Sequence, residues 1–222
     1  MSLRSGLLVR VLVKGNKKLR VGVLGSGKGS NLLAIAEACA AGKIPAEVAL
    51  VLSDVAEAGI LVHARNKGLT AQFVAPGPFR TKLDEASERV YCAALREAGV
   101  ELVVLAGFMR VLKGEFLRAF AQRIINIHPS LLPAFRGLEA WKQALEYGVK
   151  FTGCTVHFVD EGVDSGPIIA QRVVPVLAGD TPATLHERIQ QAEHAVYPEV
   201  VGALARQRIV VDGRRATWVE DP

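Results

Sequence analysis

Hydrophobic positions in the first 130 residues of this chain form two kinds of short run that alternate. Apolar, often β-branched runs are typical of buried strands, whereas apolar residues at three- and four-residue spacing are typical of helices that pack on one face. Their alternation predicts a parallel, twisted sheet with right-handed crossovers. The predicted strands are 19–24, 47–53, 71–74, 101–106 and 123–127. The predicted helices are 32–41, 56–67, one that Thr81 caps and Gly99 ends, and 113–122.

Beyond residue 127 the pattern predicts paired strands. Segments 151–159 and 167–177 alternate apolar and polar residues across a turn-rich loop, 160–166, which predicts a long antiparallel hairpin. Asp212-Gly213 lies between two β-rich runs and predicts a short hairpin over 208–219. Two more helices are expected, at 139–147 and from Thr181-Pro182 onward, the latter with a break at Pro198. The predicted fold class is α/β: a Rossmann-like, open, mostly parallel twisted sheet with helices on both faces and a C-terminal antiparallel hairpin.

The positive charge of the chain is concentrated at its N-terminus. The 222 residues include 27 Lys and Arg against 22 Asp and Glu, a net charge of +5. Residues 1–20 hold six of the basic residues and no acidic one, so the rest of the chain is almost neutral. We expect residues 1–18 to be a flexible basic extension, with 7–13 a frayed end rather than an additional strand. Residues 19–222 are predicted to form a single domain.

Composition excludes several classes of protein. Half of the residues are hydrophobic and 6% are aromatic, which is typical of a soluble α/β protein. No apolar run is long enough to span a membrane, and 6–13 is too short for a secretory signal. Cys39, Cys92 and Cys154 are widely spaced and form no disulfide framework or metal motif, so we expect a cytoplasmic protein without a metal. Beyond the N-terminal extension no basic stripe with interleaved aromatics indicates a nucleic-acid partner.

A glycine-rich loop, 25–31, connects the first predicted strand to the first helix. Glycines allow close approach of the backbone, and free N–H groups at a helix N-terminus bind anions. The spacing is GxGxG, which is neither the GxGxxG of dinucleotide sites nor a Walker loop. A single phosphate is therefore the better fit, with Ser30 as the expected N-cap of the helix. Alone, the loop is also compatible with tight turns.

The stretch Asn126 to Pro133, Asn-Ile-His-Pro-Ser-Leu-Leu-Pro, is the candidate centre of chemistry. Asn126 and His128 are two residues apart, so in a strand their side chains share a face. An amide and an imidazole would then meet at the carboxyl end of a strand, where open α/β sheets bind ligands. From these eight residues alone, a buried structural histidine and a loop asparagine are equally acceptable.

Several stretches together resemble one family. They are 25–31, 106–112, 126–133, 160–167 and, near the C-terminus, Gln191-Ala192-Glu193-His194. In this order, over residues 19–219, they are similar to the folate-dependent glycinamide ribonucleotide formyltransferases of the formyltransferase superfamily. The resemblance implies transfer of a formyl group from 10-formyltetrahydrofolate to the amine of phosphoribosylglycinamide, in purine biosynthesis. It implies small molecules as partners, no metal, and a monomer or homodimer.

The same resemblance implies roles for individual residues. Asn126, His128 and Asp164 match the catalytic trio. The residues that match the ribonucleotide-binding set are Gly29, Ser30, Asn31 and Glu193. The residues that match the folate-binding set are Lys82, Met109, Arg110, Val111, Leu112 and Asn126. By this match residues 19–125 would be the phosphoribosyl-binding half of the domain, and 126–222 the catalytic and folate-binding half.

Formyl transfer to an amine is chemistry that such a trio can perform. Attack on the formyl carbon makes a tetrahedral oxyanion, which an amide donor such as Asn126 stabilises. A cationic His128 can hydrogen-bond the oxyanion and protonate the departing folate nitrogen. The carboxylate of Asp164 would favour the cationic ring and accept the amine proton, directly or through water. The histidines His63, His157, His186 and His194 have no partner pattern and are expected to be structural or solvent-facing.

Three alternatives remain at this point. Methionyl-tRNA formyltransferases and formyltetrahydrofolate hydrolases share the Asn/His/Asp arrangement but normally carry an additional domain, for which we expect no room here. A non-catalytic phosphate-binding module on the same sheet would leave Asn126 and His128 incidental. A Rossmann dehydrogenase is disfavoured by the glycine spacing.

Overall fold

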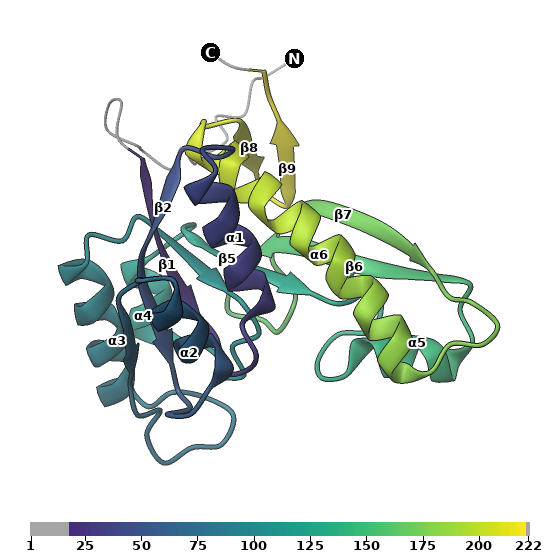
Figure 1. The fold of residues 1–222 in the computed structure, drawn as a ribbon, viewed down its shortest axis with the longest axis horizontal. Coiled ribbons are helices and arrows are strands. Elements are labelled where there is room, and N and C mark those ends of the chain that lie inside the picture. Colours follow the sequence, from purple (N-terminus) through teal and green to yellow (C-terminus); the bar gives the residue numbers. More distant parts are fainter. Residues whose placement is uncertain (1–17, 221–222) are drawn as a thin grey trace.

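A nine-stranded sheet forms the centre of the computed structural model, which describes residues 18–220 (Figure 1). The strand order is β3-β2-β1-β4-β5-β6-β7-β9-β8. The strands are β1 (Leu19–Leu24), β2 (Ala46–Ser53), β3 (Ala71–Phe73), β4 (Leu102–Leu105), β5 (Ile124–His128), β6 (Phe151–Phe158), β7 (Ile168–Pro175), β8 (Ile209–Asp212) and β9 (Arg215–Trp218). The predictions for 1–18, including the run 7–13, lie outside the described residues apart from Lys18 itself.

The sheet has a parallel part and an antiparallel part. Strands β1 to β5 pair in parallel, as their apolar runs separated by helices predict. β6 then pairs antiparallel with β5 and with β7, and β8 pairs antiparallel with β9. Both predicted hairpins are therefore confirmed, as is the predicted fold class.

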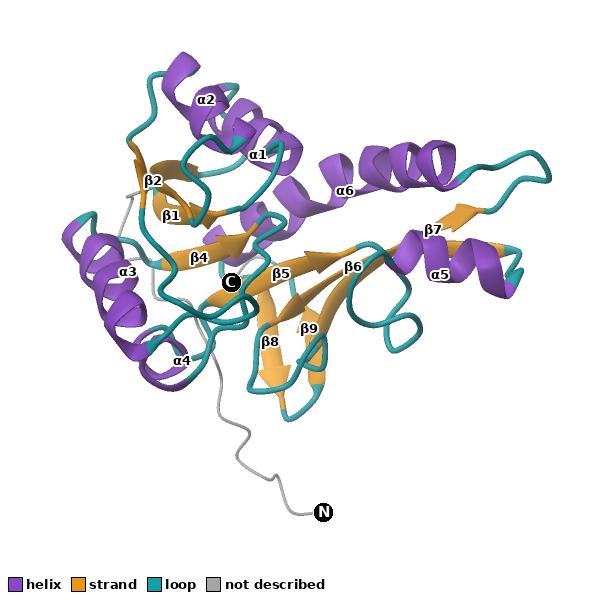
Figure 2. Cartoon of the chain, turned by 90° about the horizontal axis from the view of Figure 1, so that it is seen from below, coloured by secondary structure: helices purple, strands orange, loops and turns teal. Residues whose placement is uncertain are grey.

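Helices cover both faces of the sheet, as Figure 2 shows. One buried cluster joins α1, α2 and α6 to the sheet, and a second joins α3 and α4 to the opposite face. α5 packs beside α6 through its partly buried Trp141 and Leu145. The helices are α1 (Ser30–Ala40), α2 (Gly59–Asn66), α3 (Glu85–Glu97), α4 (Gly114–Ala119), α5 (Ala140–Tyr147) and α6 (Pro182–Ala205).

Two predicted helix caps are wrong. Gly29, in the left-handed conformation, is the N-cap of α1, and Ser30 is already its first residue without a capping bond. α3 begins after Asp84, whose carboxylate accepts the Ser87 N–H, and not after Thr81. In both places another residue suits the cap position better. Gly29 adopts positive φ without a steric penalty, and the Asp84 carboxylate is a strong acceptor for the free N–H groups of the helix.

The predicted break at Pro198 is also wrong, because α6 continues through it to Ala205. Proline removes one backbone donor from a helix and normally bends or ends it. Here Tyr197, Pro198, Val200 and Val201 are all buried, so packing of this segment on the sheet outweighs the lost hydrogen bond. The cap at Thr181 is confirmed by reciprocal bonds with Thr184. The ends of α2 and α4 lie inside their predicted limits.

Tyr197 joins this helix to the ends of two central strands. Its fully buried hydroxyl lies 2.8 Å from the carbonyl oxygen of Leu105 and 3.2 Å from that of Ile125. Leu105 pairs with Asn126 in the sheet, so α6 is fixed directly beneath the strand that carries the candidate residues. Burial raises the pKa of Tyr197 well above its ordinary value, which keeps the hydroxyl a donor.

Replacing Tyr197 with Phe should lower the free energy of unfolding by about 1–3 kcal/mol, because the buried carbonyls lose their donor. Chemical denaturation of both proteins measures the difference. Tyr147→Phe is the matched control, since that side chain is 80% exposed and should change stability little. Equal unfolding free energies for wild type and Tyr197→Phe would show that the hydroxyl stabilises nothing.

Candidate active site

Asn126 and His128 lie on one face of β5, as their spacing predicts. In the antiparallel ladder Asn126 is opposite His157, and His128 is opposite Thr155. His128 is the last residue of β5 and only 4% exposed, so the imidazole is held inside the protein rather than in solvent. The strand thus delivers an amide and an imidazole to one spot, as the sequence indicates.

Asp164 reaches the same spot from the loop between β6 and β7. One of its carboxylate oxygens lies 3.4 Å from His128 Nδ1 and also accepts the Gly137 N–H at 2.9 Å. Asp164 has a φ of 48°, in the left-handed region that Asp tolerates better than most residues. This backbone conformation is less favourable than an ordinary one, and it directs the carboxylate of Asp164 toward His128. The structure brings together the three residues expected to form the trio.

Both ring nitrogens of His128 have protein neighbours. Nε2 is 2.8 Å from the carbonyl oxygen of Phe135, and Nδ1 faces the carboxylate of Asp164. A carbonyl oxygen can only accept, so Nε2 carries a proton. A proton on Nδ1 would place a donor against the carboxylate of Asp164.

His157 belongs to the site, although the sequence indicated no role for it. Its Nε2 lies 3.3 Å from the amide nitrogen of Asn126 and 3.8 Å from the carboxylate of Asp164. Its Nδ1 donates to the Phe158 carbonyl at 2.8 Å, which leaves Nε2 to accept from Asn126. Burial lowers the pKa of His157, in keeping with a neutral ring. A neutral His157 therefore fixes which way the Asn126 amide points.

The glycine loop follows β1 and leads into α1, beside the carboxyl end of β4. Gly29 has a φ of 84°, and a Cβ there would lie 2.7 Å from the Ile60 backbone. A Cβ on Gly25 would lie 2.7 Å from the Ala106 carbonyl oxygen. Glycine is required at both positions, because the loop is pressed between α2 and the end of β4. The first N–H groups of α1, which have no partner inside the helix, are thus directed to the edge where His128 ends β5.

Asn31 and Glu193 form a buried polar pair at this loop. The Asn31 side-chain nitrogen donates to the Glu193 carboxylate at 2.9 Å, although the two residues are 162 positions apart. Asn31 Oδ1 is buried and has no hydrogen-bond partner among the described residues. Burial raises the pKa of Glu193 to about 7. This buried pair therefore has one hydrogen-bond acceptor, Asn31 Oδ1, that no described residue uses.

The expected folate-binding residues lie on two adjoining segments. Val111 donates its N–H to Thr81 at 2.9 Å, and Lys82 and Val111 form an isolated bridge. The Lys82 ammonium lies 4.2 Å from the centre of the Phe79 ring, Met109 is 55% exposed, and Leu112 is buried. Arg110 is largely committed to the protein, because it pairs with Asp54 and donates to two carbonyls. This segment follows β4, whose last residue, Leu105, pairs with Asn126 in β5.

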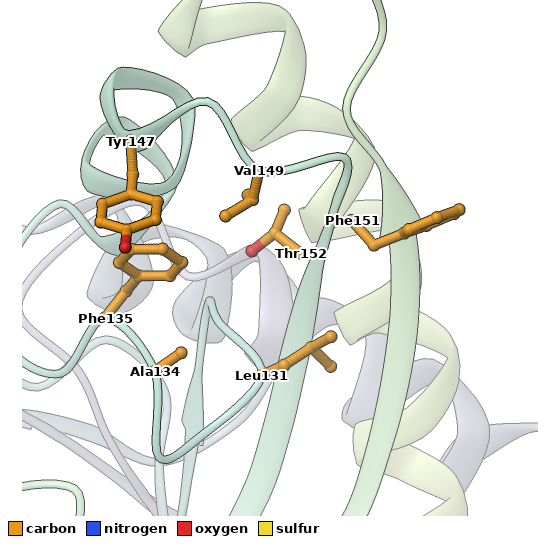
Figure 3. A pocket seen from close by; sticks show the side chains of 7 residues that line it. All are labelled: Leu131, Ala134, Phe135, Tyr147, Val149, Phe151 and Thr152. Carbon is orange, nitrogen blue, oxygen red and sulfur yellow. The ribbon is translucent and has the colours of Figure 1, made fainter.

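Two cavities in the described part of the chain are lined by other residues than the trio. One of about 420 Å³ is lined by Leu131, Ala134, Phe135, Tyr147, Val149, Phe151 and Thr152. Figure 3 shows the rings of Phe135 and Tyr147 close together on one side of it. Their centres are 5.9 Å apart in an edge-to-face contact. Phe135 thus turns its ring to this cavity while its carbonyl holds His128. A second cavity, of about 500 Å³, is bordered by Trp218, Ile44 and Pro198, among others.

A metal site, a reactive thiol and a membrane span each place their own requirements on residues 18–220. No group of three or more His, Cys, Asp and Glu side chains in this range is placed to hold a metal ion. Burial raises the pKa of Cys154 to about 12 and that of Cys92 to about 11, so neither is a ready thiolate nucleophile. None of the helices in this range is long and apolar enough to cross a bilayer.

Comparison with known proteins agrees with the fold and shows the family of the chain. Residues 19–201 match the family described as formyl transferase, so the chain belongs to the formyl transferase family. Phosphoribosylglycinamide formyltransferase of Escherichia coli (strain K12) is 41% identical, over 91% of this chain and 94% of that protein. The crystal structure of glycinamide ribonucleotide transformylase 1 from Symbiobacterium toebii has a TM-score of 0.88 and 51% identity, with 93% of this chain and 96% of that chain covered.

The chain is also similar to part of a longer human protein. Trifunctional purine biosynthetic protein adenosine-3 of Homo sapiens is 40% identical over 222 residues, which are 99% of this chain. The chain spans 22% of the length of that protein. The similarity therefore concerns one segment of a multifunctional chain.

Glu193 should make stability depend on pH. Its pKa of about 7 in the folded protein lies above its ordinary 4.5. The stabilisation by protonated Glu193 is therefore complete below about pH 4.5 and lost as the pH rises through 7. A shift of this size corresponds to about 3 kcal/mol.

Glu193→Gln should flatten the fall in unfolding free energy between pH 5 and 8, measured by denaturation at each pH. Glu187→Gln, an exposed position on the same helix, is the control, and an equal slope in wild type and Glu193→Gln would contradict the assignment.

Proposed function

We propose that this protein transfers the formyl group of 10-formyltetrahydrofolate to the amine of phosphoribosylglycinamide, giving formylglycinamide ribonucleotide and tetrahydrofolate. The observation that carries the proposal is the meeting of Asn126, His128 and Asp164 on and beside β5, next in the sheet to β4 and the segment 106–112, which is in turn hydrogen-bonded to the phosphate-type glycine loop. A bound amine and a bound formyl donor would be held side by side there, which replaces a bimolecular encounter by a positioned one.

Asn126 is proposed as the oxyanion donor. When the amine nitrogen attacks the formyl carbon, the carbonyl oxygen gains negative charge, which an amide N–H stabilises without becoming charged itself. The contact of Asn126 with His157 uses one amide hydrogen and leaves the other available to this oxygen. His157 then acts through Asn126, as a positioning residue.

His128 is proposed as the acid. As the bond between the formyl carbon and the folate nitrogen N10 breaks, N10 must gain a proton, and the imidazolium can supply it. Nε2 is engaged with the Phe135 carbonyl, and a neutral carbonyl is an easier partner to exchange than the carboxylate at Nδ1. Substrate binding would therefore release Nε2 from Phe135 while Asp164 keeps hold of Nδ1.

Asp164 is proposed to stabilise the cationic His128 and to receive the proton that the attacking amine must lose, directly or through water. Its two oxygens face different partners: one meets His128 and the Gly137 N–H, and the other is 3.8 Å from His157. The second oxygen is thus the less occupied acceptor. The proton balance closes because N10 gains one proton and the amine loses one.

The glycine loop is proposed to hold the single phosphate of the ribonucleotide, through Gly29, Ser30 and the start of α1. Asn31 and Glu193 would contact the same substrate through the unused Asn31 oxygen and the carboxyl group. With a pKa of about 7, Glu193 can bear a proton at neutral pH, so it need not repel the phosphate and can donate as well as accept. The folate would lie along Met109–Leu112 and Lys82.

The remaining features of the proposal follow from this chemistry. Residues 19–125 would supply the phosphoribosyl-binding half, and 126–222 the catalytic and folate-binding half. The folate is a co-substrate, and no step calls for a metal. A cytoplasmic monomer or homodimer would suit such an enzyme.

A substrate-dependence assay tests the function. Tetrahydrofolate release from 10-formyltetrahydrofolate should be slow until phosphoribosylglycinamide is added, and should then match the formation of formylated ribonucleotide mole for mole. Without the amine, water is the only nucleophile, and the site does not hold water in place beside the formyl carbon as it would hold a bound amine. Fast release without the amine would indicate a hydrolase, and formylation of charged initiator tRNA would indicate the tRNA enzyme. If the folded protein showed no turnover with any acceptor, the result would indicate a non-catalytic phosphate-binding module.

Asp164→Asn should reduce kcat by about 10²-fold or more, because the acid-base partner of His128 is lost while the shape is retained. Steady-state kinetics with both substrates gives kcat and each KM. Asp160→Asn, in the same loop and bonded to Ser165, is the control that separates loop disturbance from loss of the carboxylate at His128. A kcat for Asp164→Asn equal to that of the Asp160→Asn control would remove Asp164 from the proposed trio.

A further inference from the structure

Asp54 is a buried carboxylate outside the proposed trio. It follows β2, and its side chain is only 2% exposed. One of its oxygens accepts from the Ser26 hydroxyl of the glycine loop at 2.5 Å, and the other accepts from Arg110 Nε at 2.7 Å. Each carboxylate oxygen thus has a different partner, and the two partners belong to different walls of the proposed site.

The bonds of Ser26 and Arg110 extend this contact to three segments. Ser26 Oγ accepts the Met109 N–H at 2.9 Å, so the glycine loop is joined to the segment 107–112 a second time. Arg110 Nη1 donates to the Phe79 carbonyl at 2.5 Å and to the Arg80 carbonyl at 2.6 Å. The loop before Lys82, the segment that carries Met109, and the glycine loop therefore all depend on one carboxylate.

The chemistry of this network requires a carboxylate. Ser26 and Arg110 both present donors to Asp54, and only an acid anion offers two acceptor oxygens. An asparagine has one acceptor and would turn its NH₂ group toward a donor. The buried charges of Asp54 and Arg110 compensate each other, so loss of one leaves the other unpaired in a desolvated place.

We propose that Asp54 is a positioning residue for the folate end of the site: it sets the segments 79–82 and 107–112 against the glycine loop. This inference rests on the proposed function, because it takes Lys82 and Met109–Leu112 as the folate wall. Asp54 need not touch either substrate. It acts through Arg110 and Ser26, and its loss should displace the wall on which the folate lies.

Asp54→Asn should therefore raise the KM for 10-formyltetrahydrofolate about tenfold or more, since displacements of about 1 Å can have such effects. The KM for the ribonucleotide should change much less, and kcat at saturating folate should stay near the wild-type value. Ser26→Ala, which keeps the Asp54–Arg110 pair but removes the bond from Met109, should raise the folate KM by a smaller factor. It serves as the second variant if Asp54→Asn folds poorly.

Asp180→Asn is the matched control. The side chain of Asp180 is also little exposed, at 3%, and is paired with an arginine, Arg188, at 2.7 Å; it also accepts the Leu177 backbone N–H and the Thr184 hydroxyl. This variant should lower Tm without raising either KM. Amide hydrogen exchange of the free proteins supplies an independent readout: Asp54→Asn should speed exchange in 79–82 and 107–112, and Asp180→Asn should not.

The outcomes separate the inference from the function beneath it. An unchanged folate KM in Asp54→Asn, with a fall in Tm like that of Asp180→Asn, would overturn the positioning role. An increase confined to the ribonucleotide KM would also overturn it, because the carboxylate would then serve the glycine loop alone. A wild-type protein without ribonucleotide-dependent turnover would refute the proposed function, and hydrogen exchange would still decide whether Asp54 orders the two segments.

Discussion

The pairing of β5 with β6 is the interaction on which the proposed site depends. β5 is the last strand of the parallel part of the sheet, and β6 runs against it. Parallel neighbours bring the ends of β1 and β4, with their loops, to the edge where His128 ends β5. The antiparallel neighbour instead places His157 directly opposite Asn126 and lets the following loop fold back to His128. Because β6 runs against β5, it ends at Phe158 opposite Ile125, and the loop that follows must fold back along β5 to bring Asp164 to His128.

Backbone groups, more than other side chains, hold the buried polar residues in place. His128 has the Phe135 carbonyl, His157 has the Phe158 carbonyl, and Asp164 has the Gly137 N–H. Such partners are fixed by the fold and cannot change rotamer, so each ring or carboxylate keeps one orientation. Two of the anchoring positions, Phe135 and Asp164 itself, have positive φ without being glycine, which costs energy of order 1–3 kcal/mol each. Strained backbone of this kind persists where the surrounding structure determines it, as it does between these two loops.

Hydrophobic pattern predicted the sheet and both hairpins because burial of apolar strands is a local property of the sequence. The predicted meeting of Asn126 and His128 has the same local origin, a two-residue spacing in a strand. The catalytic role of Asp164 was predicted only from the family resemblance, because an aspartate in a glycine-rich loop ordinarily serves to form the turn. His157 was missed because its role is set by the register of β6 on β5, a long-range pairing that places it opposite Asn126. The wrong break at Pro198 has the same cause, because long-range packing decided the local conformation.

Arg110 shows how a residue can belong to a binding wall without offering its charge to a ligand. The family resemblance implied that Arg110 binds folate, yet its Nε and Nη1 donate to Asp54 and to two loop carbonyls. A guanidinium has five donors in a rigid plane, so it can fix three backbone segments at once in a way that lysine cannot. Open α/β sheets bind ligands where neighbouring loops part, and loops that part need something to set their separation. In this protein Asp54, Ser26 and Arg110 connect the loops that follow β1, β2 and β4, so a buried ion pair, and not apolar packing alone, holds these loops at their spacing.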